Sequence, residues 1–387
     1  MEDYIESAYN KVNIEEGKNI LEAFLREIYL SGSTSNKDIA QAIKLPIPIV
    51  SAIKKEFIKQ NIVIQENGIK LTSIGNRYVE EELKYKGIKK QVYSELIDDD
   101  ITLFNDILSG LNEIMDNRPK ADLTIDQTNC TAATSLKRAI YCLKNSSLIG
   151  KRIMCIGDDD LVSVSLSLII KNLFEDPKDK ACIYVIDIDN RYLDYISEIS
   201  AKLNLNIICE NLDLRYPMKD ELKNKFDSFF TDPPYTLNGL KLFLKRGLET
   251  MKKEKGLSIF LSYGHKSPDF TLNMMKIFTD LNIVPIEIIK GFNRYVGAGI
   301  IGNEGQFIHL NTTSLSKNLK EESFSGNIYT GEIKNRVKIY VCKNCKEKYE
   351  IGHEKRIKTI EELKNLGCNK CKSHTFIIQN KNYNSKS

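Results

Sequence analysis

The sequence predicts an α/β protein made of an N-terminal winged helix, a central Rossmann-like domain and a C-terminal zinc-ribbon module. Three observations support this fold class. Between about residues 150 and 310, short apolar runs alternate with helical stretches, which is typical of a parallel sheet with crossover helices. A helix-rich segment with an Asn-Gly hairpin precedes this region, and two Cys-x-x-Cys pairs follow it.

The domain boundaries follow from where these patterns change. We expect a winged helix over residues 1–88, a helical linker over 89–118, the Rossmann-like domain over 119–335, a zinc ribbon over 336–380 and a disordered tail over 381–387.

The bulk composition does not by itself imply a nucleic-acid or membrane partner. The chain has 387 residues, of which 42% are hydrophobic, so two or three domains with buried cores are expected. The net charge is only +4, so the chain as a whole is not basic enough to indicate binding to nucleic acid or to an anionic membrane. No apolar run reaches the length of about 18 residues that a membrane span needs. The acidic start, Met1-Glu2-Asp3-Tyr4, lacks the apolar core of a signal peptide, so a cytoplasmic protein is expected.

The N-terminal segment has the element order of a winged helix. Helical spacing of apolar residues predicts helices over 20–29, 36–43 and 50–60, a turn over 45–48, a hairpin over 62–71 and a further helix from residue 72. The third helix would enter the DNA major groove in one interpretation, and it carries Lys54, Lys55 and Lys59 but few residues that read bases. The alternative is a dimerisation module or a lid, and we favour it because an enzyme domain follows.

A polar stretch over residues 126–131 separates helices predicted at 90–118 and 134–143. In nucleotide-binding enzymes, the segment before the first strand often folds over the ligand. Gln127 and Thr131 are therefore candidate ligand contacts, although a helix N-cap explains Thr131 at least as well.

The central region predicts seven strands. They lie at 152–156, 182–186, 206–210, 226–230, 256–263, 283–289 and 306–310, and the last two are expected to pair as a hairpin. A crossover helix is expected over 162–174 and a glycine-rich loop over 291–299.

The turn Gly157-Asp158-Asp159-Asp160 follows the first of these strands. Three adjacent carboxylates disfavour phosphate and suit a cationic ligand, although an isolated triplet of this kind is more often a solvated acidic loop. Further carboxylates follow the second, third and fourth strands, namely Asp187, Asp189, Asp213 and Asp232. Because ligands of open parallel sheets bind at the carboxyl edge, these seven carboxylates predict an acidic well there.

The motif Asp232-Pro233-Pro234-Tyr235 ends the fourth strand. Amino-directed methyltransferases use this arrangement, in which the carboxylate accepts a hydrogen bond from the amine, the proline backbone presents a carbonyl, and the aromatic ring walls the site. Such a site works by positioning and proton removal. The motif indicates a methyltransferase-type Rossmann-like domain.

The cysteines divide into two groups. Five scattered cysteines in apolar contexts are expected to be small buried residues of a reducing compartment: Cys130, Cys142, Cys155, Cys182 and Cys209. Cys342, Cys345, Cys368 and Cys371 form two pairs separated by 22 residues, following a strand expected at 337–341. This spacing predicts a structural zinc site with four thiolates, and His353 and His374 are not needed to complete it. Unmetallated thiols or a redox pair are the alternatives.

Gly157-Asp158-Asp159-Asp160 and Asp232-Pro233-Pro234-Tyr235-Thr236, behind an N-terminal winged helix, resemble the branched-chain polyamine synthases of thermophilic archaea and bacteria. The resemblance covers residues 15–335. It implies transfer of aminopropyl groups from decarboxylated S-adenosylmethionine to the internal secondary amine of spermidine. Two transfers would give N(4)-bis(aminopropyl)spermidine, with methylthioadenosine as by-product.

The resemblance also implies roles for single residues. Asp159 would be the catalytic carboxylate, Asp232 and Tyr235 would frame the acceptor, and Asp187 and Asp213 would hold the nucleoside. We also place other residues around the co-substrate: Gln127, Gly157, Asp158, Asp160, Asp189 and Pro233. A homodimer through the winged helix is expected.

Two other functions compete with this one. An amino-methyltransferase acting on DNA or RNA would explain the accessory modules. It explains the acidic triplet poorly, because the three carboxylates would repel the phosphates of the nucleic acid. A transcription regulator that senses a small ligand would leave Asp232-Pro233-Pro234-Tyr235 without a role.

Overall fold

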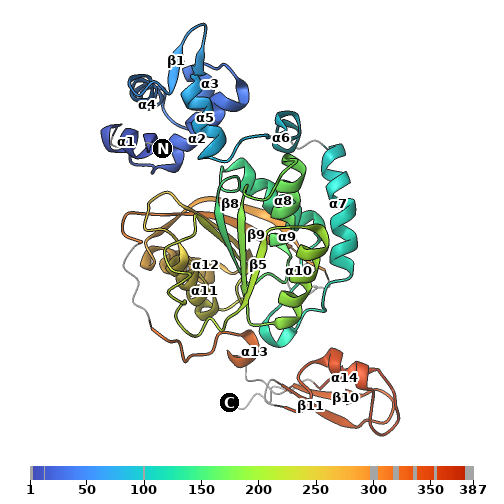
Figure 1. The fold of residues 1–387 in the computed structure, drawn as a ribbon. Helices are drawn as coiled ribbons and strands as arrows, with labels where there is room; N and C mark the ends of the chain where they lie inside the picture. The colour runs from blue at the N-terminus through green and yellow to red at the C-terminus, as the bar shows by residue number, and fades with distance from the viewer. Residues whose placement is uncertain are drawn as a thin grey trace.

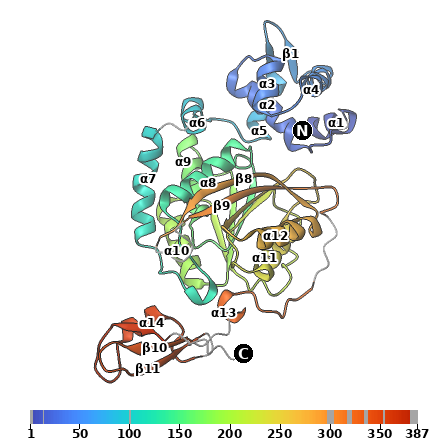
Figure 2. The same cartoon turned by 180° about the vertical axis from the view of Figure 1, so that it is seen from behind.

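The computed structural model describes residues 3–12, 14–98, 101–296, 304–316, 322–333, 338–352 and 355–379. A helical N-terminal module and a small β-rich C-terminal module lie at opposite ends of a central α/β domain (Figures 1 and 2). The predicted tail, His353, Val337 and the part of the predicted loop over 297–299 lie outside the described residues. Within these ranges, no helix combines the length and the apolar character needed to span a membrane.

The N-terminal module contains the predicted helices and hairpin. Its elements are α1 (Tyr4–Val12), α2 (Asn19–Ser31), α3 (Asn36–Ala42), α4 (Ile47–Lys59), β1 (Val63–Gln65), β2 (Ile69–Leu71) and α5 (Ser73–Glu81). Helix α1 was not expected. Helix α4 begins three residues before the predicted start, because Pro46 is accepted as the N-cap and Pro48 fits the first turn, where no donor is needed. The winged-helix assignment itself stays a prediction.

Two helices join this module to the central domain, α6 (Lys90–Ile97) and α7 (Ile101–Asp116). One continuous apolar core extends from α1 through α6 to one face of the central sheet. The ammonium of Lys151, before the first strand of the sheet, also forms an ion pair with Glu22 of α2. The N-terminal module is therefore packed against the central domain.

The central sheet has seven strands in the order β5-β4-β3-β6-β7-β9-β8, and β9 runs antiparallel to both neighbours. The strands are β3 (Arg152–Ile156), β4 (Cys182–Asp187), β5 (Ile207–Asn211), β6 (Ser228–Thr231), β7 (Ser258–Gly264), β8 (Ile283–Arg294) and β9 (Glu304–Thr312). The predicted parallel strands and the terminal hairpin are present. The order reverses between β3 and β6, and this is the switch point where such sheets bind ligands.

Helices cover both faces of the sheet (Figures 1 and 2). One face carries α8 (Ala132–Lys144), α9 (Val162–Leu173) and α10 (Asn190–Leu203), and the other carries α11 (Leu237–Thr250) and α12 (Pro268–Asp280). A short 3-10 turn, η1 (Leu123–Ile125), precedes α8, and α13 (Thr330–Ile333) precedes the C-terminal module. This double layer leaves the carboxyl edge of the parallel strands for the site.

The predicted glycine-rich loop is wrong over residues 291–294, which belong to β8. Asn293 and Arg294 pair with Gly305 and Glu304 of β9, and the register shifts between Ile289 and Asn293. Gly291 has φ +70°, which a side chain disfavours, so this glycine serves a bulge within a strand.

The C-terminal module has its own small core. Three antiparallel strands lie in the order β11-β10-β12 beside one helix: β10 (Lys338–Cys342), β11 (Lys348–Ile351), β12 (Phe376–Ile378) and α14 (Ile360–Leu366). All nine cysteines of the chain are free thiols. Of the five scattered ones, Cys130, Cys142 and Cys155 are buried as predicted, whereas Cys182 and Cys209 are half-buried.

Candidate active site

A cavity lies at the carboxyl ends of β3, β4 and β6. It is lined by Ile125, Asp126, Gln127, Thr128, Gly157, Asp159, Asp187, Ile188, Asp232, Pro234, Tyr235, Phe243 and Tyr329. Six residues singled out in the sequence are among them: Gln127, Gly157, Asp159, Asp187, Asp232 and Tyr235. The acidic turn, the second strand end and the Asp-Pro-Pro-Tyr motif therefore meet in one place, as the carboxyl-edge argument predicts.

Asp159 is the member of the triplet that lines this cavity. Its carboxylate accepts a hydrogen bond from the backbone N–H of Thr128 at 3.2 Å. Burial raises the pKa of Asp159 well above its ordinary value, and the nearby carboxylates of Asp160, Asp232, Asp187 and Asp158 raise it further. Once ionised, a carboxylate with a raised pKa is a stronger proton acceptor than an exposed aspartate.

Asp158 serves the helix that follows the turn. Its carboxylate accepts hydrogen bonds from the backbone N–H groups of Val162 at 2.7 Å and Ser163 at 3.1 Å, at the start of α9. Burial raises its pKa to about 7 in spite of these bonds. Asp158 thus satisfies donors that the helix leaves open, and it lies outside the cavity lining.

Asp160 is braced by a buried arginine. The Nη1 atom of Arg138, on α8, lies 2.5 Å from its carboxylate, and both side chains are only 3% exposed. The backbone N–H of Cys130 donates to the other oxygen at 2.5 Å. Arg138 also reaches Asp232 at 3.3 Å, and its Nε donates to Asn293 at 2.9 Å. One guanidinium therefore ties together two of the carboxylates expected in the acidic well.

Asp232 is held by two donors on the same oxygen, Oδ2. They are the Tyr295 hydroxyl at 2.8 Å and Arg138. Burial raises the pKa of Asp232 to about 8, although the charge of Arg138 acts in the opposite direction. The ring of Tyr235 lines the cavity, and burial together with the charge of Asp232 raises its pKa well above the ordinary value. Tyr235 is thus a neutral wall of the cavity.

Asp187, at the end of β4, lies in the cavity lining. Its carboxylate accepts hydrogen bonds from the backbone N–H groups of Asp158 at 3.1 Å and Asp189 at 2.9 Å, and burial raises its pKa. Asp189 is the N-cap of α10 and accepts a hydrogen bond from Gln127 at 3.1 Å. Gln127 is therefore fixed where the segment before α8 crosses the site.

The remaining predicted residues lie around the cavity and not in its lining. Asp213 is partly exposed and accepts a hydrogen bond from the backbone N–H of Arg215. Pro234 lines the cavity instead of Pro233. For Asp158, Asp160, Asp189, Asp213 and Pro233, contact with a ligand stays a prediction. Thr131 is the N-cap of α8, which confirms the simpler of its two interpretations.

Sequence reasoning missed Arg138, Tyr295, Asp126 and Tyr329. Arg138 is buried and lies on the apolar face of its helix. A charged residue at such a position is a sequence signal that could have indicated a buried partner of opposite charge. Tyr329 enters the cavity from the segment before α13, where the Thr330 N–H donates to Asp126 at 2.6 Å. This contact joins positions 126 and 330, and no local pattern predicts it.

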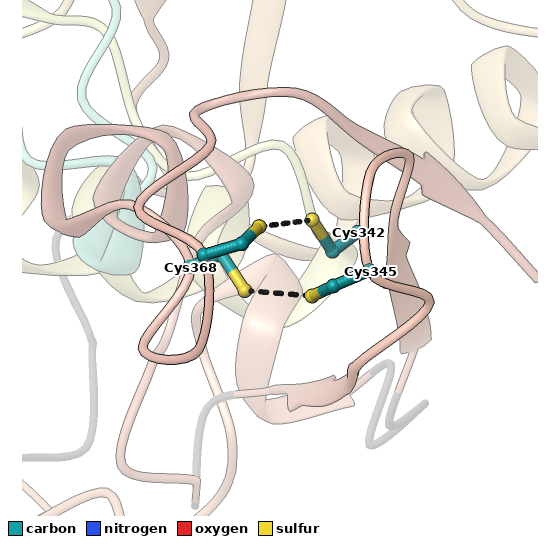
Figure 3. A group of neighbouring side chains, drawn as sticks. Cys342, Cys345 and Cys368 are labelled. Atoms are coloured by element: carbon teal, nitrogen blue, oxygen red, sulfur yellow. Dashed lines mark hydrogen bonds between the residues drawn. The ribbon is translucent and has the colours of Figure 1, made fainter.

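Four cysteine sulfurs gather in the C-terminal module, within 4.8 Å of one another. The sulfurs of Cys345 and Cys368 face each other in Figure 3. They are 3.4 Å apart, and those of Cys342 and Cys371 are 3.6 Å apart. Tetrahedral zinc with Zn–S bonds of about 2.3 Å separates its sulfurs by about 3.8 Å. The cluster therefore has the donors and the spacing of a site that could hold zinc.

Comparison with known proteins identifies the family. The family model for the branched-chain polyamine synthase A C-terminal domain matches residues 106–366. A Methanocaldococcus jannaschii protein of uncharacterized function is 38% identical over 91% of this chain and 88% of its own length. The N(4)-bis(aminopropyl)spermidine synthase of the same organism is 31% identical over 70% of this chain and 78% of its own length.

A solved structure has the same fold. It is the branched-chain polyamine synthase of Thermus thermophilus, in complex with N4-aminopropylspermidine and 5′-methylthioadenosine. The TM-score is 0.52 at 18% sequence identity, and the match covers 84% of this chain and 96% of the other. From the family match over most of its length and from these relatives, the chain belongs to the branched-chain polyamine synthase family.

Proposed function

We propose that this protein is an aminopropyltransferase that uses decarboxylated S-adenosylmethionine and spermidine. It adds two aminopropyl groups to the internal nitrogen, giving N(4)-bis(aminopropyl)spermidine and 5′-methylthioadenosine. The observation that carries the proposal is the convergence of Asp159, Asp187 and Asp232 in one cavity at the switch point of the sheet.

The charge of this cavity favours cationic substrates. The donor carries a sulfonium, and the acceptor carries ammonium groups, so three converging carboxylates stabilise both. An amino-methyltransferase acting on DNA or RNA is the alternative, and it would bring phosphates toward the same carboxylates. The electrostatic difference favours the polyamine.

The first transfer starts with a protonated secondary amine, because such amines have pKa values of about 10. Asp159, in its ionised form, accepts the proton, which leaves the nitrogen lone pair free to attack. Asp232 and Tyr235 hold the acceptor. The nitrogen then forms a bond to the methylene carbon beside the sulfonium. The carbon–sulfur bond breaks, its electron pair goes to sulfur, and neutral 5′-methylthioadenosine leaves.

Before the second transfer, Asp159 releases the first proton to solvent. The tertiary ammonium formed by the first attack then loses its proton to the ionised Asp159. Attack on a second donor forms the fourth carbon–nitrogen bond and again releases neutral 5′-methylthioadenosine. The nitrogen then carries a permanent positive charge and no proton. Stabilisation of this charge falls to the carboxylate of Asp232, and to that of Asp159 once its second proton has passed to solvent.

The nucleoside by-product distinguishes the proposed transfer from its alternative. The protein is incubated with spermidine and either decarboxylated or intact S-adenosylmethionine, and the nucleosides are separated by chromatography. The proposal expects 5′-methylthioadenosine from the decarboxylated donor only. S-adenosylhomocysteine from the intact donor would indicate methyl transfer and contradict the proposal.

Ionisation of the carboxylates should make the ligand-free protein less stable as pH rises. The folded state raises the pKa of Asp159 and Asp232 above the unfolded value of about 4, so it binds these protons more tightly and loses stability as they leave. We expect the melting temperature to fall between about pH 5 and pH 9, and saturating spermidine to restore most of it at the alkaline end. Calorimetry across this range is the measurement. A melting temperature that rises with pH would contradict the carboxylate cluster.

Zinc in the four-cysteine cluster is proposed as structural, since four thiolates leave no open position. Replacing Cys345 by Ser should lower the bound zinc, measured by atomic emission, from about one ion per chain to none. The matched control is Cys182→Ser, a half-buried cysteine of the central sheet. Equal zinc in both variants would contradict a zinc site here.

The N-terminal module is proposed as a winged helix used for homodimerisation. Its apolar core is continuous with that of the central domain. This supports a structural role for the module over that of an independent DNA-binding domain on a flexible linker.

A further inference from the structure

Lys266 lies in a cage of three aromatic rings beside the cavity. Its ammonium is 4.8 Å from the centre of the Tyr235 ring, 5.3 Å from that of Phe270 and 5.6 Å from that of Tyr263. The backbone carbonyl of Tyr235 accepts from the same ammonium at 3.5 Å. Lys266 follows β7 and precedes α12, so it stands at the same edge of the sheet as the Asp-Pro-Pro-Tyr motif.

The cage shares one wall with the cavity, because Tyr235 belongs to both. Burial raises the pKa of Asp126, which lines the cavity, and the charge of Lys266 acts in the opposite direction. Two of the walls are fixed. Tyr263 is fully buried and donates its hydroxyl to the carbonyl of Thr236 at 3.2 Å. Phe270 lies in the first turn of α12, and its backbone N–H donates to the side chain of the N-cap, Ser267.

Rings arranged in this way recognise ammonium groups, because each ring face is negative. The end of a linear polyamine is an aminopropyl chain with a terminal ammonium, and a lysine side chain presents the same group on an alkyl stem. The cage therefore has the chemistry of a polyamine subsite, and this chain fills it with its own ammonium.

We propose that the Tyr235, Tyr263 and Phe270 cage is an ammonium subsite that Lys266 occupies, and that Lys266 thereby limits the length of the acceptor. An acceptor bound in the cavity must end at the Tyr235 wall, because the next ammonium position is already filled. This inference rests on the proposed function, and it specifies which acceptors the enzyme prefers. It names the residue that makes a triamine, and not a longer tetraamine, the preferred acceptor.

Replacing Lys266 by Ala empties the cage. We expect the KM for spermine, a linear tetraamine, to fall about tenfold, whereas the KM for spermidine changes by less than about twofold. Lys266→Arg keeps a cation in the cage and should keep the wild-type preference. Lys276→Ala, an exposed lysine on α12, is the matched control and should also leave both values unchanged.

A double variant tests whether the cage itself takes the longer acceptor. Adding Phe270→Ala to Lys266→Ala removes one wall, so the gain for spermine should be lost. Calorimetric titration of both variants with spermine, without donor, gives the same comparison independently of turnover. Unchanged spermine binding and KM in Lys266→Ala, in a protein whose wild type transfers aminopropyl groups, would overturn this inference. Absence of transfer in the wild type would instead contradict the proposed function.

Discussion

Replacing Asp159 by Asn is expected to reduce aminopropyl transfer by about three orders of magnitude and to raise the melting temperature of the protein. The amide cannot accept the proton of the acceptor amine, and general bases contribute about 10²- to 10⁴-fold to rates. The same change removes one carboxylate from a buried cluster in which the carboxylates repel one another. Ionisation of Asp159 destabilises the folded state relative to the unfolded state, so its removal should raise the melting temperature. Loss of activity and gain of stability are thus predicted together.

Single-turnover rates and calorimetric melting at about pH 8 measure both effects in the same sample. Asp194→Asn is the matched control, because Asp194 is exposed on α10 and should change neither quantity. A near wild-type rate in Asp159→Asn would remove Asp159 from the chemistry. A marked fall in its melting temperature would mean that the carboxylate stabilises the fold, contrary to the electrostatic argument.

Replacing Arg138 by Met should destabilise the fold strongly. The guanidinium is buried between Asp160 and Asp232, and removing one partner of a buried ion pair costs about 3–5 kcal/mol. Because the loss comes from carboxylates left without a counter-charge, it should be largest at alkaline pH and smaller where they are protonated. Denaturant unfolding at several pH values is the measurement.

Arg191→Met gives the matched comparison for this prediction. Arg191 pairs with Asp189 at 2.5 Å, but its side chain is 51% exposed, and surface ion pairs contribute about 0–1 kcal/mol. A loss of similar size in both variants, or a loss in Arg138→Met that does not depend on pH, would show that the buried charge network is not what the arginine supports.

The sequence was sufficient wherever a local pattern determines the outcome. Apolar runs predicted the parallel strands, and the carboxyl-edge rule then brought Asp159, Asp187 and Asp232 together without any coordinates. The two cysteine pairs likewise predicted the sulfur cluster, because metal-binding turns fix their own spacing. Each strand end and each cysteine pair is a pattern of neighbouring residues, and general rules of packing and metal binding then bring these patterns together.

The pattern could not separate the three aspartates of the turn by structural role. Asp158 caps α9, Asp160 pairs with Arg138, and Asp159 lines the cavity, and only the fold distinguishes them. Tyr295 was expected in a glycine-rich loop, yet it donates to Asp232 from just beyond the end of β8. Such long-range contacts depend on how β8 pairs with β9, which no residue spacing reveals.

The acceptor is the part of the proposal that most needs measurement. Methanocaldococcus jannaschii contains two relatives, and this chain is more similar to the one whose function is uncharacterized than to the N(4)-bis(aminopropyl)spermidine synthase. Within this chain, Lys266 is the residue beside the cavity that we propose as a determinant of the acceptor.

The mass and branching of the product test the central claim most directly. The protein is incubated with spermidine and excess decarboxylated S-adenosylmethionine, and products are examined by mass spectrometry with fragmentation. We predict spermidine carrying two added aminopropyl groups on one internal nitrogen, with two molecules of 5′-methylthioadenosine released for each product. A linear product extended at a terminal amine, or no product at all, would contradict the proposed function.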